Sequence, residues 1–182
     1  TDKGVVHEST PDTSYDNASE IRKGDATGAP LYASDLVAWY PLQESSGSTA
    51  YDFSGNNDDA TYDGVVPGGG TDFAGTNTPR LDGSNDFIDC PEFNADFTSD
   101  FSISLWCYPR TISGNSRLFS ASGSNNHINF QLNNNGNSKV GFFSGRNAGI
   151  IKSSSSLSTD TWYHLVAVSD RADKDYIYID AF

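Results

Sequence analysis

The feature that most constrains the fold is the alternation of apolar and polar residues in several short segments. Residues 101–108, FSISLWCY, place every second side chain on the same face of an extended strand. The apolar face carries Phe101, Ile103, Leu105 and Cys107. Residues 127–133, HINFQLN, repeat the same period of two. Because no long segment keeps a helical period, the pattern predicts strands throughout.

Turns rich in Gly, Asn, Ser and Asp separate these segments, which is typical of an all-β domain. The clearest of the expected strands lie within residues 36–42, 86–90, 101–108, 127–133, 139–145, 161–170 and 174–182. Roughly ten short strands at this spacing predict a two-sheet antiparallel β-sandwich of the jelly-roll type. Residues 153–158, SSSSLS, are expected to form a polar loop. The core is expected to hold Trp39, Trp106 and Trp162.

Residues 1–33 are polar and lack sustained periodicity. We therefore expect an irregular N-terminal arm or linker ahead of a sandwich over residues 34–182. The arm is either a disordered tail or a clasp on a neighbouring subunit. The chain has no Met, so an initiator Met before Thr1 could have been clipped. That would suit a protein that leaves the cell inside a virus particle.

The charge of the chain excludes several classes of partner. The chain has 24 acidic residues against 11 basic ones and a net charge of −13. Such a surface repels nucleic acids and anionic membranes, and no apolar run is long enough to span a bilayer. We expect no nucleic-acid partner and no membrane insertion. The charge suits either a secreted domain or a protein from concentrated salt, and the scarcity of Lys favours the second.

The two cysteines, Cys90 and Cys107, leave two alternatives open. They form one disulfide, or they are two free buried thiols. Only the geometry of their Cβ atoms decides between the two.

Five short motifs occur in an order typical of one family. They are WYPL at 39–42, DFSGN at 52–56, LDGSN at 81–85, FSISLW at 101–106 and WYHLV at 162–166. In this order they resemble the laminin-G-like, concanavalin-A-like jelly rolls, over about residues 35–182. The resemblance implies a sandwich fold, a role in adhesion or carbohydrate binding and, in many members, a structural calcium ion near such loops.

The end of the chain departs from that family. Such domains usually continue after the strand that corresponds to YIYID, residues 176–180, through a Gly turn and further strands. Here Ala181 stands where Gly is usual, and the sequence stops at Phe182. Either the chain is a piece of a longer protein and lacks its last strands, or a neighbouring subunit completes the sheet, because an open sheet edge is a liability for a monomer.

The stretch YDFSGNNDDATYDG, residues 51–64, is a candidate metal loop. The oxygen ligands that Ca²⁺ prefers are offered by Asp52, Asn56, Asn57 and Asp59. The spacing is not that of an EF-hand loop, and the resemblance does not identify the ligands. The alternative is an Asx turn in which Asp52 and Asn56 cap backbone amides while the other acids face solvent.

We expect no catalytic residues. Glycoside hydrolysis needs two carboxylates across a cleft, and the four Glu residues all lie outside the strong strands, at positions 8, 20, 44 and 92. His164 belongs to the WYHLV strand motif and is expected to be structural.

A ligand site is expected on one face of residues 127–133. His127, Asn129 and Gln131 alternate with apolar residues there and offer the planar amides that hold sugars. The alternative is that the Asn-rich loops around this strand are only turns.

These observations predict a non-catalytic recognition or adhesion module. It binds a glycan or a protein on an extracellular or virion surface of a halophilic system. One alternative is a structural spike, turret or decoration subunit of a virus particle or surface appendage, in contact with neighbouring copies of itself. The other is an accessory binding domain of a longer glycoside-active enzyme.

Overall fold

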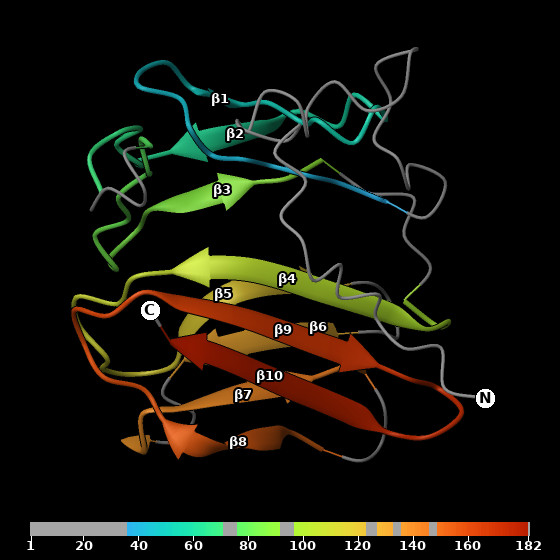
Figure 1. Ribbon diagram of the computed structural model, residues 1–182. Coiled ribbons are helices and arrows are strands. Elements are labelled where there is room, and N and C mark those ends of the chain that lie inside the picture. Colours follow the sequence, from blue (N-terminus) through green and yellow to red (C-terminus); the bar gives the residue numbers. More distant parts are fainter. Residues whose placement is uncertain are drawn as a thin grey trace, which may run out of the picture. The chain divides into compact units, whose positions relative to one another are not determined.

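The computed structural model describes residues 36–70, 76–91, 97–122, 127–132, 136–145 and 149–181, and all ten elements assigned there are β-strands (Figure 1). They are β1 Thr49–Ala50, β2 Ala60–Asp63, β3 Phe87–Asp89, β4 Phe101–Cys107, β5 Ser116–Ser122, β6 His127–Leu132, β7 Lys139–Phe143, β8 Ile151–Ser156, β9 Tyr163–Ser169 and β10 Asp175–Ala181. Every strand pair among them is antiparallel. The predicted arm, residues 1–33, lies outside the described residues.

The chain divides into two compact units, Thr1–Asn94 and Ala95–Phe182. The first unit contains one sheet with the strand order β1-β2-β3. Its small core consists of Ala50, Ala60, Tyr62 and Val65. Ile88 of β3 packs against this core, as do Tyr40, Leu42 and Cys90 from the flanking segments.

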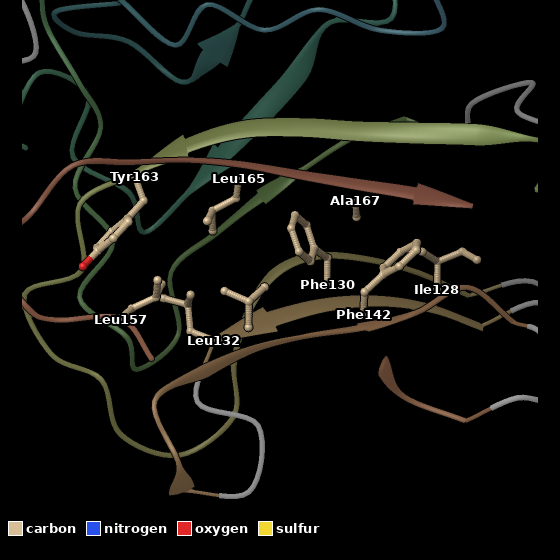
Figure 2. Close-up of a cluster of buried hydrophobic side chains, with 9 residues drawn as sticks. Ile128, Phe130, Leu132, Phe142, Leu157, Tyr163, Leu165 and Ala167 are labelled. Carbon is tan, nitrogen blue, oxygen red and sulfur yellow. The ribbon is translucent and has the colours of Figure 1, made fainter. Parts of the chain in front are cut away.

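The second unit is a sandwich of two sheets. Their strand orders are β10-β9-β4 and β5-β6-β7-β8, and they form two layers (Figure 1). Figure 2 shows Leu165 of β9 reaching toward Phe130 of β6 between the layers. The buried cluster consists of Ile128, Phe130, Leu132, Val140, Phe142, Leu157, Tyr163, Leu165 and Ala167. The prediction of an all-β, two-sheet antiparallel sandwich is confirmed.

The alternation in β4 has the predicted consequence. β4 pairs with β9 without interruption from Phe101 opposite Ser169 to Cys107 opposite Tyr163. The predicted apolar face, Phe101, Ile103, Leu105 and Cys107, packs against the buried cluster. A strand of period two placed between a core and an outer surface divides its side chains in this way.

Three expectations about local structure were wrong. Residues 36–42 form no strand, because Leu42 has a left-handed φ of 56° and Asn56 caps the carbonyls of Leu36 and Val37. Residues 153–156 belong to β8 instead of a loop. Ser153 is buried there, and its hydroxyl accepts a hydrogen bond from the Val140 amide.

The third error concerns Trp106, which points away from the core and is 42% exposed. Its ring stacks on His164 of the paired strand, with centroids 4.8 Å apart. The two cysteines are both free thiols.

Candidate functional site

The Asp52 side chain organises a tight turn in the first unit. Its Oδ1 accepts hydrogen bonds from the amides of Trp39 and Ser54, both at 2.9 Å. Its Oδ2 accepts from the Ser54 hydroxyl at 2.6 Å and from the Asp58 amide at 3.2 Å. The bond to Ser54, two residues ahead, is the Asx turn that the DFSGN motif favours. The bond to Trp39 joins the turn to a segment 13 residues earlier.

These contacts decide the ionisation of Asp52. Partial burial alone would raise the pKa of its carboxyl group. The hydrogen bonds from Ser54, Trp39 and Asp58 outweigh that effect and leave the pKa below its ordinary value of 3.8. Asp52 is therefore a carboxylate held ionised by main-chain and hydroxyl donors.

The other three predicted metal ligands lie around the same turn in different roles. Asn56 donates from its carboxamide to the carbonyls of Leu36 and Val37, at 2.9 Å each. Asp59 accepts a hydrogen bond from the Asp52 amide at 2.8 Å. Asn57 is exposed and has a left-handed φ of 63°, a conformation that Asn adopts more readily than most residues.

The contacts favour the Asx turn over the metal loop. A carboxylate offers about four lone-pair positions, and four donors already occupy those of Asp52. In the part of the chain that the structure describes, no group of three or more His, Cys, Asp or Glu side chains could hold a metal ion. Asp52 in this arrangement does not fit the demand of Ca²⁺ for six to eight oxygen ligands, and calcium at this loop stays a prediction.

The structure places the predicted ligand residues on the outer face of β6. Ile128, Phe130 and Leu132 belong to the core, so the alternate side chains face outward. His127 is exposed, Asn129 is half-buried, and Gln131 is only 4% exposed. Asn129 donates to the Gln131 side-chain oxygen at 2.8 Å. The His127 ring centroid lies 6.4 Å from that of Phe143.

The strands beside β6 add two cations that the sequence reasoning missed. Gln131 pairs with Arg117 of β5 and with Gly141 of β7, and Gly141 pairs with Lys152 of β8. One row across the outer face therefore carries Arg117 and Lys152 on either side of Gln131, and both cations are exposed. We call Arg117, His127, Asn129, Gln131 and Lys152 the β6 face.

A signal for this face was present in the sequence. Residues 101–159 contain no Asp or Glu, although the whole chain has 24. Residues 1–94 hold 17 of these acids and four of the 11 basic residues, so they carry the entire net charge of −13. Residues 95–182 hold seven of each sign and are neutral as a set. The β5-β6-β7-β8 sheet is thus free of carboxylate side chains within an acidic protein.

The sequence comparison agrees with the architecture of the second unit. Residues 82–182 match the family model described as the concanavalin A-like lectin/glucanases superfamily. The match includes β3 to β10 and covers more than half of the chain. No curated protein and no solved structure matches the chain. The described residues contain no helix that is both long and apolar enough to cross a bilayer.

Proposed function

Since this chain belongs to the concanavalin A-like lectin/glucanase superfamily, we propose that it is a non-catalytic recognition module whose β6 face binds an anionic glycan. Laminin-G-like domains of this kind are binding modules for glycans or proteins in general. The choice of an anionic glycan comes from the charge and the side chains of the β6 face.

The observation that carries the proposal is the absence of Asp and Glu from residues 101–159. Arg117 and Lys152 lie on the outer strands of a four-stranded sheet. At roughly 4.8 Å per strand their backbones are about 14 Å apart, which suits charges spaced along an extended saccharide chain. Between them, the buried Gln131 accepts a hydrogen bond from Asn129, which leaves the second N–H of the half-buried Asn129 carboxamide to donate to a sugar hydroxyl group.

The expected affinity is modest. An exposed ion pair contributes about 0.2–1 kcal/mol, so Arg117 and Lys152 together supply about 2 kcal/mol at most. The Asn129 amide, which Gln131 orients, and the His127–Phe143 pair must provide the rest. A repeated polysaccharide would raise the apparent affinity through multivalent contact.

We place this activity on an extracellular or particle surface in concentrated salt. The support is the net charge of −13 with only five Lys residues, because acidic side chains keep a protein soluble where salt screens their repulsion. The net negative charge is carried by residues 1–94, because the acidic and basic residues of 95–182 balance. The first unit is therefore the part expected to gain stability as salt is added.

The test is a titration of the protein with carboxylated and sulfated polysaccharides, with a neutral polysaccharide and duplex DNA as comparison ligands. The double variant Arg117→Ser/Lys152→Ser should lose binding roughly tenfold, equal to about 1.4 kcal/mol. Lys174→Ser is the matched control, because Lys174 is an exposed cation outside the β6 face that lies against Tyr176. Absence of binding to both anionic polysaccharides would refute the proposal, as would a preference for DNA.

A second candidate function is that of a structural subunit that assembles with copies of itself. The observation that favours it is the separation of charge between residues 1–94 and the β6 face. An acidic surface on one copy that meets a basic face on the next makes a head-to-tail contact, and such contacts build rings or open chains. Sedimentation velocity at low and high salt tests it, and a monomer under both conditions would exclude it.

A further inference from the structure

A shallow hollow of about 200 Å³ lies in the first unit, beside the Asp52 turn. It is lined by Pro41, Gln43, Glu44, Tyr51 and Phe53. Tyr51 is 53% exposed, although it follows directly after the buried Ala50 of β1. An aromatic side chain exposed at the wall of a hollow is available to a ligand.

Glu44 is held in one orientation at this hollow. Its Oε1 accepts a hydrogen bond from the Tyr51 amide at 3.1 Å, and its Oε2 accepts from the Tyr62 hydroxyl at 2.8 Å. Burial, together with the bond to Glu44, raises the pKa of Tyr62, so the phenol stays protonated and donates. Each carboxylate oxygen has capacity for a second hydrogen bond. Glu44 is thus an oriented acceptor for ligand donors.

The Asp52 turn supports Phe53, another residue of the lining. Trp39 donates its amide to Asp52 and accepts a hydrogen bond on its carbonyl from the Phe53 amide at 2.8 Å. The Trp39 and Phe53 rings meet edge to face, with centroids 6.2 Å apart. The hydrogen bonds of Asp52 therefore position Phe53, and the DFSGN motif acts as the scaffold of the hollow.

The net charge of residues 36–94 favours a neutral ligand over an anionic one. Residues 36–94 contain ten acidic side chains and a single basic one, Arg80. This surface repels sulfated or carboxylated compounds. A neutral sugar complements the lining, since its hydroxyl groups donate hydrogen bonds to the Glu44 carboxylate and one face of its ring carries C–H groups that pack on the Tyr51 ring.

We propose that the hollow binds one neutral sugar ring, with the C–H face of the ring against Tyr51 and its hydroxyl groups donating to Glu44. The site is independent of the β6 face, which lies in the second unit. It does not rest on the proposed binding of anionic glycans.

The experiment is saturation-transfer NMR of the whole chain with glucose, galactose, mannose and N-acetylglucosamine. We expect transfer to the C–H protons of at least one of these sugars, and a loss of affinity of roughly tenfold for Tyr51→Ala. Tyr178→Ala is the matched control, because Tyr178 is 55% exposed in the second unit. Glu44→Gln keeps the shape of the hollow, removes its charge and is expected to weaken binding as well.

Three results would overturn the proposal. They are the absence of saturation transfer to every neutral sugar, equal transfer in wild type and Tyr51→Ala, and preferential binding of a lysine-rich peptide at the hollow. The double variant Arg117→Ser/Lys152→Ser should bind the neutral sugar as the wild type does. If the anionic-glycan proposal for the β6 face is wrong, or if the neutral-sugar proposal for the hollow is wrong, the variants therefore give different patterns of binding.

Discussion

The guanidinium carbon of Arg171 lies 5.5 Å from the centre of the Phe101 ring. The same group donates hydrogen bonds to the carbonyls of Ser99, at 3.3 Å, and of Ser144, at 2.8 Å. Asp100 accepts a hydrogen bond from the Arg171 amide at 2.7 Å. One side chain in the turn between β9 and β10 thus ties the segment before β4 to the end of β7.

Arg171→Ala is expected to destabilise the protein by about 2–4 kcal/mol, because hydrogen bonds from a charged donor and a cation–π contact are lost together. Arg171→Lys should recover only part of the loss, since an ammonium group cannot reach the same carbonyls in a fixed planar geometry. Urea unfolding measures the stability of both variants. Lys174→Ala in the same turn is the control, and an equal loss in this variant would refute the anchoring role of Arg171.

Two buried serines are expected to respond in opposite directions. The Ser144 hydroxyl donates to Asp175 at 2.7 Å, so Ser144→Ala should cost about 1–3 kcal/mol. The Ser169 hydroxyl is fully buried, and the described residues provide it with no hydrogen-bond partner. Ser169→Ala should therefore leave stability unchanged or raise it by about 1 kcal/mol. Denaturant titration measures the free energy of unfolding of the two variants. A large loss of stability in Ser169→Ala would contradict the structure.

Acid is expected to remove the stabilisation that Asp52 provides. Its pKa is lower in the folded than in the unfolded chain, so its contribution is complete above the ordinary pKa of 3.8 and is lost as the pH falls below that value. Asp52→Asn should be less stable than the wild type at pH 7, and the difference should shrink in acid. Ser54→Ala removes one of the donors and should move the acid loss to higher pH. Thermal melts between about pH 2 and about pH 7 measure each effect.

Chelation separates the two interpretations of the Asp52 turn. Four protein donors already occupy the acceptor positions of the Asp52 carboxylate, so we expect EDTA to leave the melting temperature unchanged. Asp52→Ala should lower it equally with and without EDTA, by an amount that corresponds to about 2 kcal/mol. If EDTA lowers the wild-type melting temperature and Asp52→Ala abolishes that sensitivity, the turn holds calcium.

The cysteines are expected to be unreactive in the folded protein. Burial raises the pKa of the Cys107 thiol to about 12 and also raises that of Cys90, so few thiolates form at pH 8. A thiol reagent should label the native chain slowly and both cysteines at once after unfolding. Mass spectrometry counts the labels, and a chain that takes none after unfolding without reductant would instead contain a disulfide.

Much of the local structure in both units could be predicted because its signals are local. A period of two determines which side chains of β4 share a face, whatever the strand pairs with. Asp52, Ser54 and the glycine between Ser54 and Asn56 encode a turn through contacts two residues apart. Local patterns of this kind also carried the resemblance to the family that residues 82–182 match.

The outcomes that were missed depend on contacts between distant segments. The sequence by itself determined that Trp106 and Phe101 lie on opposite faces of one strand, and that residues 127–132 alternate. Only the tertiary structure decided which face the second sheet covers, and it left Trp106 exposed while it buried Ser153 and Gln131. It also placed Arg117 and Lys152 in one row across four strands. Burial and strand register depend on the stacking of sheets whose strands are far apart in sequence, and a local period contains no information about that stacking.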